Sequence, residues 1–217
     1  MKKQILSIGA FALLSLALVT SGCKKTDADT TAPAVSVVGS NPYYIQKGTT
    51  WSDPGATATD DVDGTIAASA SGTVTTATVG AYTVTYTAKD AAGNVDTKTR
   101  VVNVVDVDGY FATVVDVSPY PGGSSNSYNE TAHLVTDGSG KVNLTKFGDY
   151  VNGSVYYNLT GLNTLTVPSQ TVTCGLTPAS RMFSGSGTLS SSAPQVTITF
   201  DETTGGTTIH SQDTYTR

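Results

Sequence analysis

Hydrophobic and polar residues alternate with period two along most of this chain after residue 33. The clearest example is GAYTVTYTAKD, in which Tyr82, Val84 and Tyr86 fall on one face and the threonines between them on the other. This period predicts an antiparallel strand with one face on a core. The segment DAAGN at residues 90–94 predicts a hairpin turn, and VDTKTRVVNVVD predicts the strand that returns from it.

The same pattern continues to the end of the chain. Between residues 107 and 217, about eight alternating runs are separated by turn sequences rich in Pro, Gly, Asn and Asp. These runs predict an antiparallel up-and-down meander, which closes into a barrel or folds into a sandwich. Long runs of Ala, Leu, Glu and Lys are absent after residue 22. The predicted fold class is therefore all-β, with a β-sandwich over residues 34–106 and the meander after it.

The N-terminus has a different pattern. Two lysines precede a continuous apolar run from Ile5 to Val19. This run is shorter than the about 20 residues that cross a bilayer and fits the apolar region of a signal peptide. It is followed by TSGC at residues 20–23, which resembles the lipobox of bacterial lipoproteins. The resemblance implies that residues 1–22 are removed and that Cys23 is acylated. The alternative is an ordinary secretory signal in which Cys23 is incidental.

Residues 23–33 predict a lipidated cysteine followed by a flexible polar tether. Asp27 and Asp29 match in part the acidic segment that, in lipoproteins of the Bacteroidetes type, resembles a surface-export signal. Residues 29–31, DTT, are similar to the O-glycosylation sequon of that phylum. These resemblances imply an outer-membrane protein held by its acyl chains, with the cell surface favoured and the periplasmic face still open. A plain solvated linker is the alternative interpretation of the tether.

Three motifs occur in order between residues 34 and 106. They are G-x-x-[aromatic]-x-D-P-G-A at Gly48–Ala56, the D-x-D-G turn at Asp61–Gly64, and the YTVTY run with the later DAAGN. In this order they resemble the bacterial surface Ig-like domain, a family also named after the Ig-like part of a pesticidal crystal protein. The resemblance implies an Ig-like sandwich that acts as a surface spacer or adhesion module, and it implies neither toxicity nor catalysis.

The C-terminal segment, residues 107–217, carries a second resemblance. Gly109–Phe111, TVPSQ at residues 166–170, GSGT at residues 185–188 and the final YTR are similar to small lipocalin-like domains of Bacteroidetes lipoproteins. The resemblance implies a barrel that holds an apolar ligand. The alternative is a barrel filled by its own side chains.

Four carboxylates offer a candidate calcium site. Asp60, Asp61, Asp63 and Asp90 could gather oxygens around Ca²⁺. Their spacing is not that of an EF-hand, and Asp-x-Asp-Gly is also a favourable turn sequence. We predict turns here and no metal or other cofactor.

A cluster of aromatic residues offers a candidate sugar site. Trp51 with Tyr43 and Tyr44 could form a platform on which a sugar ring stacks. A lone tryptophan in a small β-sandwich more often belongs to the core, and we favour the core interpretation.

Cys174 is the only cysteine besides Cys23. Because Cys23 is predicted to be acylated, we expect no disulfide and interpret Cys174 as a small buried hydrophobe. A nucleophile would need a histidine beside it, and nothing in the sequence places His133 or His210 there.

Charge and missing motifs restrict the function. The net charge is −5, charged residues make up 13% of the chain, and Lys24-Lys25 is its only basic pair after the signal segment. Nucleic-acid binding is therefore not expected. The motifs G-x-S-x-G, H-E-x-x-H and the P-loop are absent, so we predict no enzyme.

We expect a non-catalytic, lipid-anchored envelope protein whose Ig-like spacer presents a C-terminal domain that binds a glycan or an envelope protein. A small apolar-ligand carrier is the alternative.

Overall fold

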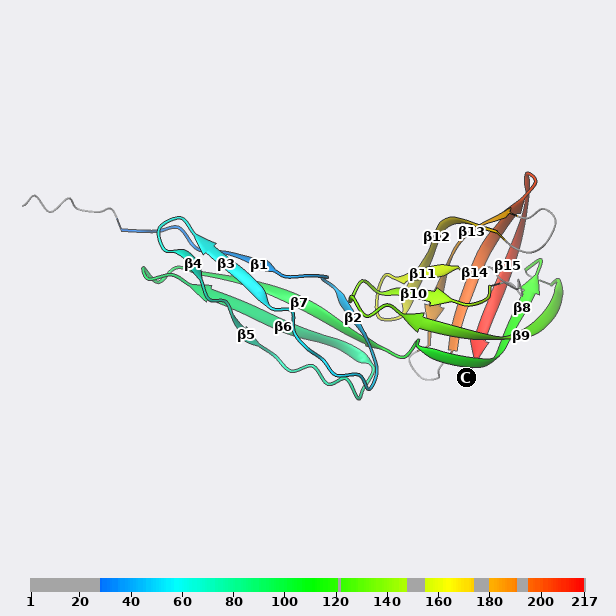
Figure 1. Cartoon of the computed structure of the whole chain (residues 1–217), viewed down its shortest axis with the longest axis horizontal. Helices are drawn as coiled ribbons and strands as arrows, with labels where there is room; N and C mark the ends of the chain where they lie inside the picture. The colour runs from blue at the N-terminus through cyan, green and yellow to red at the C-terminus, as the bar shows by residue number, and fades with distance from the viewer. Residues whose placement is uncertain (1–27, 121, 148–154, 174–179, 191–194, 217) are drawn as a thin grey trace, which may run out of the picture.

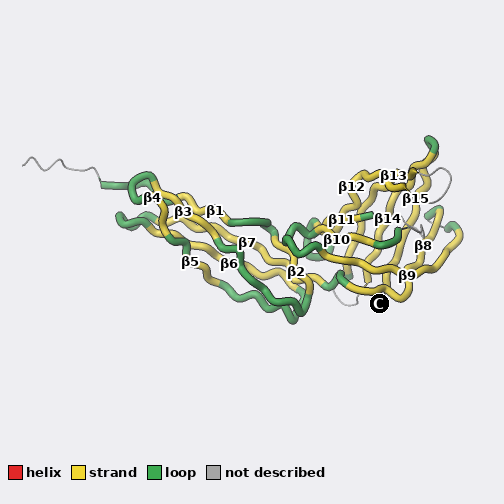
Figure 2. Tube along the Cα trace, in the orientation of Figure 1, coloured by secondary structure: helices red, strands yellow, loops and turns green. Residues whose placement is uncertain are grey.

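A computed structural model describes residues 28–120, 122–147, 155–173, 180–190 and 195–216. Over these residues the chain forms strands and turns, and the predicted all-β fold class is confirmed. Figures 1 and 2 show two units arranged end to end, a sandwich followed by a barrel.

The first unit is a sandwich of two sheets, with strand orders β1-β3-β4 and β2-β7-β6-β5. Strand β2 runs parallel to β7, and the other described pairs in these sheets are antiparallel. The bounds are β1 Ala34–Val37, β2 Tyr43–Gln46, β3 Ala56–Asp60, β4 Gly64–Ile66, β5 Ser69–Ser71, β6 Gly80–Lys89 and β7 Val95–Val105.

The core of the sandwich follows the period seen in the sequence. On β6, Val84, Tyr86 and Ala88 are buried, whereas the threonines between them lie on the outer face. The predicted hairpin joins β6 to β7, and Gly93 has a φ of +105°, a conformation that glycine adopts without strain. The alternation therefore fixes which face of β6 meets the opposite sheet.

The second unit is a closed barrel of eight antiparallel strands, in which each strand pairs with its neighbours in sequence. The sequence left a barrel and a sandwich open. The structure is a barrel because β8 pairs with both β9 and β15, so the sheet has no free edge. The bounds are β8 Gly109–Ser118, β9 Ser124–Leu134, β10 Lys141–Leu144, β11 Tyr156–Leu159, β12 Thr164–Thr173, β13 Ser180–Leu189, β14 Gln195–Thr204 and β15 Thr207–Thr216.

The buried apolar side chains of the barrel form one cluster. At its centre the ring of Phe147 lies 5.4 Å from that of Phe183 and 4.4 Å from that of Phe200, measured between centroids. Aromatic pairs at these distances add to the stabilisation from burial. Buried polar side chains, among them Glu130 and Asp213, face the same interior.

Candidate functional site at the domain junction

The two units are joined by Asp106–Asp108, between the end of β7 and the start of β8. The predicted division at residues 106 and 107 falls within this link. The side chain of Gln46 holds it: Nε2 donates to Asp106 Oδ1 at 2.9 Å, and Oε1 accepts from the backbone N–H groups of Val107 and Asp108, both at 3.0 Å. One amide therefore uses its donor and its acceptor to fix all three residues of the link.

Strand β2 contacts both units because successive side chains on a strand point to opposite faces. Tyr43 packs with the sandwich core, and its ring meets the Trp51 ring edge-on at 5.0 Å. Tyr44 is buried in the barrel cluster, and its N–H donates to the Gly138 carbonyl at 3.0 Å. The structure therefore brings Tyr43 and Trp51 together and turns Tyr44 away from them, so the three rings do not form one platform.

Two glycines of the β9–β10 turn lie against these tyrosines. Gly138 and Gly140 have φ values of +79° and +81°. A Cβ on Gly138 would overlap the Tyr43 ring, and a Cβ on Gly140 would come within 2.6 Å of the Tyr44 ring. Glycine is required here both for the backbone conformation and for the close approach. The turn of the barrel and β2 of the sandwich thus fit together without space for a side chain.

Arg100 fixes the segment that leads into β2. Its side chain is fully buried, and its guanidinium donates to Tyr86 Oη at 2.9 Å and to the backbone carbonyls of Val38 and Ser40. Asp53, from the predicted family motif, lies 3.7 Å from Arg100 Nε. The charge is therefore satisfied by hydrogen bonds and a nearby carboxylate, as a buried cation requires.

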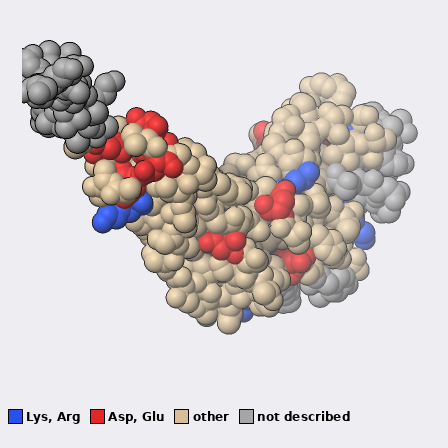
Figure 3. All heavy atoms as spheres, turned by 60° about the vertical axis from the view of Figure 1, so that its left-hand side comes forward, with Lys and Arg blue, Asp and Glu red and all other residues tan. Residues whose placement is uncertain are grey.

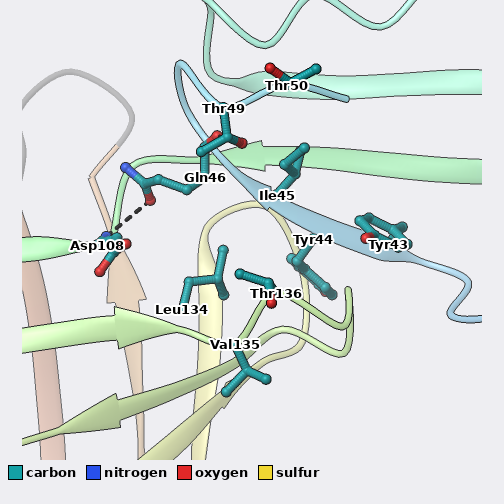
Figure 4. A pocket seen from close by; sticks show the side chains of 10 residues that line it. All are labelled: Tyr43, Tyr44, Ile45, Gln46, Thr49, Thr50, Asp108, Leu134, Val135 and Thr136. Carbon is teal, nitrogen blue, oxygen red and sulfur yellow. Dashed lines mark hydrogen bonds between the residues drawn. The ribbon is translucent and has the colours of Figure 1, made fainter. Parts of the chain in front are cut away.

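A cleft lies at the junction, beside β2. It has a volume of about 180 Å³ and is lined by residues of both units (Figure 4). Ile45 and Thr50 line it from the sandwich, and Leu134 and Thr136 line it from the barrel. Asp108, from the link, lines it as well, and its Oδ1 lies 3.2 Å from His133 Nδ1. The cleft combines apolar surface, hydroxyl groups and one carboxylate.

The four carboxylates of the candidate calcium site do not gather as one group. Asp60 Oδ1 accepts the N–H groups of Val62 and Asp63, both at 2.9 Å, which is turn geometry. Asp60 and Asp61 instead meet Asp29, and one oxygen from each lies within 4.8 Å of the others. Figure 3 shows acidic side chains gathered at one end of the sandwich.

Asp63 and Asp90 hold the neighbouring hairpin. Asp63 Oδ2 accepts from the Ala91 N–H at 2.6 Å. Burial raises the pKa of Asp90, but its hydrogen bonds from Asn94 and Gly93 outweigh this effect and lower that pKa below its usual value. The hydrogen bonds of Asp60, Asp63 and Asp90 agree with the predicted turns, and the group around Asp29 by itself does not assign a metal.

Buried polar groups cross one part of the barrel interior. Tyr128 Oη donates to Asp213 Oδ2 at 2.8 Å, and Tyr215 Oη donates to the same oxygen at 3.2 Å. Burial is the largest cause that raises the pKa of both tyrosines far above the ordinary value, so both hydroxyls remain protonated. The next cause is the charge of Asp213 for Tyr128 and the interaction with Tyr128 for Tyr215. These buried groups satisfy one another's hydrogen bonds, and the network stiffens the barrel.

Glu130 holds the chain that follows β10. Its carboxylate accepts from the N–H groups of Thr131, Thr145 and Lys146 and from the Thr145 hydroxyl. Burial raises the pKa of Glu130 although these bonds act in the opposite direction. The role visible here is structural.

The remaining candidate residues are dispersed. The signal segment, Cys23, Asp27 and Cys174 lie outside the described residues. His133 pairs with Asp108 at the junction, and His210 pairs with Asp201 on the barrel wall. The two described histidines therefore lie apart, each exposed beside a different carboxylate.

Gln46, Asp108 and Gly138 were missed as site residues from the sequence. The turn around Gly138 was visible as a turn, but its contact with Tyr43 joins residues far apart in the chain. Gln46 had no local signal, because a single amide in a strand is a common solvent-exposed residue.

Comparisons with known proteins bear on the first unit. Residues 35–104 match the family described as "Bacterial surface protein, Ig-like domain", which confirms the resemblance predicted from the motifs. No curated protein matches the chain. Among solved structures, the lipoprotein BT2262 from Bacteroides thetaiotaomicron is similar at 18% identity and a TM-score of 0.33, over 84% of this chain and 99% of that chain. A TM-score at that level does not establish a shared fold.

Within the described ranges, no helical segment has the length and apolarity to cross a membrane.

Proposed function

We propose that this protein is a non-catalytic envelope protein, anchored by acyl chains on Cys23, in which the Ig-like domain is a rigid spacer that presents the barrel for glycan capture. The anchor is supported by the lipobox-like sequence at residues 20–23 and by the polar tether after it. The bacterial surface family that matches residues 35–104 supports a location in the envelope. We place the protein in the outer membrane, facing the cell surface.

The spacer role rests on the junction. Domains joined by a flexible linker move relative to one another unless a substantial interface holds them. Here the link is only three residues long and is held by Gln46, while Tyr44 is inserted into the barrel core. A joint held in this way keeps the two units in a fixed relative orientation, so the position of the barrel is set by that of the Ig-like domain.

The ligand class rests on surface chemistry. Across β12–β15, the outer wall carries a row of paired threonines, Thr164, Thr188, Thr197 and Thr214. Few of the chain's residues are charged and its net charge is negative. Neutral hydroxyl-bearing surfaces suit neutral polar polymers such as glycans better than nucleic acid. The apolar-ligand carrier is supported less well, because charged side chains, among them Glu130 and Asp213, are buried inside the barrel beside its apolar cluster.

Retention on insoluble polysaccharides tests glycan capture. The chain from Lys24 to Arg217 is incubated with cellulose, chitin, insoluble starch and mannan, with polystyrene beads as the control. We expect retention on at least one polysaccharide and release by the matching soluble oligosaccharide. Failure to bind any of them, with the folded chain recovered in solution, would contradict glycan capture.

A further inference from the structure

The junction cleft has the size of a single ring. An apolar cavity of about 150 Å³ holds a benzene molecule, whereas pockets for larger organic ligands measure about 300–1,000 Å³. The volume of about 180 Å³ is therefore of the size of one six-membered ring.

The lining of the cleft matches a ring that is apolar on its faces and polar at its rim. Ile45 and Leu134 provide apolar surface. Thr50 and Thr136 are exposed, and no hydrogen bond from either hydroxyl occurs within the described part of the chain. A pyranose ring presents apolar C–H groups to the first kind of surface and hydroxyl groups to the second.

Asp108 gives the cleft a strong acceptor. Asp108 lines the cleft, its Oδ1 lies 3.2 Å from His133 Nδ1, and a carboxylate offers about four lone-pair positions for contacts of this kind. Bonds from a hydroxyl to a carboxylate are roughly twice as strong as bonds between neutral groups. Among the described residues that line the cleft, none is Lys or Arg, so the lining favours a neutral ring over an anionic one.

We propose that the junction cleft binds one neutral pyranose ring of a glycan, with Asp108 as the residue that accepts its hydroxyl protons. The proposal rests on the proposed glycan capture and adds its site. Because Thr50 and Leu134 belong to different units, the site is complete only while the two units are joined.

Trp51 provides a reporter for the test, because it is the only tryptophan in the chain. Its ring contacts that of Tyr43, which lines the cleft, and Thr50 precedes it in sequence. The chain from Lys24 to Arg217 is titrated with the methyl glycosides of glucose, galactose, mannose and N-acetylglucosamine. Trp51 emission is recorded, and calorimetry provides a second readout. We expect saturable binding of at least one glycoside.

Two variants locate the binding. Asp108→Asn is expected to weaken binding by about tenfold or more, since it removes a charged acceptor. Asp201→Asn is the matched control, because Asp201 also pairs with an exposed histidine but lies on the barrel wall. It should bind like the wild type. Thr136→Phe, which fills the cleft from an exposed position, should abolish binding and leave the unfolding midpoint unchanged.

The outcomes separate the site from the function. Three results would overturn the cleft proposal. The first is that no glycoside binds saturably, and the second is that sodium glucuronate binds more tightly than every neutral sugar. The third is that Asp108→Asn and Thr136→Phe both bind with wild-type affinity. If the chain is retained on a polysaccharide and neither variant reduces retention, glycan capture stands and the cleft is not its site. If a glycoside binds in the cleft but no polysaccharide retains the chain, the cleft proposal stands and capture of those polymers fails.

Discussion

Arg100 is 0% exposed, and its guanidinium meets Tyr86 of β6, Asp53 and three backbone carbonyls. Removing one member of a buried charged network costs about 3–5 kcal/mol, because the partners are left without their bonds. Arg100→Met should therefore lower the free energy of unfolding of the Ig-like domain by about that amount. Urea unfolding followed by Trp51 fluorescence measures it.

The matched control is Lys98→Met, which removes an exposed cation two residues away on the same strand. An exposed substitution of this kind should change the free energy of unfolding by about 0.5 kcal/mol or less. Equal effects of the two variants would show that the Arg100 network does not hold the domain together.

Acid should weaken the same domain through Asp96. The Val35 N–H donates to Asp96 Oδ2 at 2.9 Å and holds the pKa of that carboxyl below its usual value. A lowered folded-state pKa stabilises the fold above the unfolded value, about 3.9, and this stability is lost as pH falls through the folded pKa. We expect Asp96→Asn to flatten the fall in stability between about pH 5 and pH 2.

Unfolding midpoints in urea across that pH range provide the measurement. Asp61→Asn is the control, since among the described residues no backbone N–H donates to its carboxylate. It should keep the wild-type profile. An Asp96→Asn profile that coincides with the wild type would refute the assignment.

At the scale of single residues, the sequence revealed the motif residues of the Ig-like domain but not the hydrogen-bond network around Arg100. Gly48–Ala56 could be recognised because the spacing is local, and Asp53 was part of it. Arg100 was not singled out, since its partners lie 14 to 62 positions away and only the fold brings them together. A buried arginine has no local pattern that separates it from a solvated one.

At the scale of elements, β13 and β14 approach each other closely at two glycines. A Cβ on Gly187 would overlap the Thr197 carbonyl oxygen and come within 3.0 Å of Ile198 Cα. Overpacking of this kind costs typically about 1–3 kcal/mol. Gly187→Ala should lower the thermal stability of the barrel accordingly, measured by near-ultraviolet circular dichroism of its tyrosines.

Ser186→Ala, at the exposed neighbouring position, is the control and should leave the barrel within about 0.5 kcal/mol of the wild type. If Gly187→Ala were as stable as Ser186→Ala, the close approach would not be a constraint on the sequence. The result would also decide whether the GSGT segment is required for packing.

Element types were predictable because period two and turn residues are local signals. β6 and its hairpin matched the pattern, and β10 is one of the strands expected between residues 107 and 217. β10 ends at Leu144, and Glu130 accepts the N–H groups of the next two residues, Thr145 and Lys146. Closure of the barrel depends on pairing β8 with β15, about a hundred residues apart, and no local pattern specifies it.

At the scale of the whole molecule, the fit of Gly138 against Tyr43 should set the rigidity of the junction. Gly138→Ala introduces a Cβ into the Tyr43 ring, so the barrel turn must move away from β2. We expect a broader distance distribution and a larger radius of gyration in small-angle X-ray scattering of the chain from Lys24 to Arg217.

Gly48→Ala is the control for backbone strain. Gly48 has a φ of +82°, nearly that of Gly138, and nothing lies within 4 Å of a Cβ built on it. Both variants therefore carry the same cost of about 1–2 kcal/mol for an alanine in that conformation. Identical scattering curves for the two variants would argue against a rigid junction.

Protease treatment of intact cells, with wild type beside Cys23→Ala, tests the central claim of a lipid-anchored display protein most directly. The cleaved protein is followed by blotting, and the N-terminal peptide is weighed by mass spectrometry. We predict that wild-type protein begins at an acylated Cys23 and is cleaved from the outside, whereas Cys23→Ala is not acylated and is released. A wild-type N-terminal peptide without acyl chains, or acylated protein that the protease cannot reach on intact cells, would contradict this account.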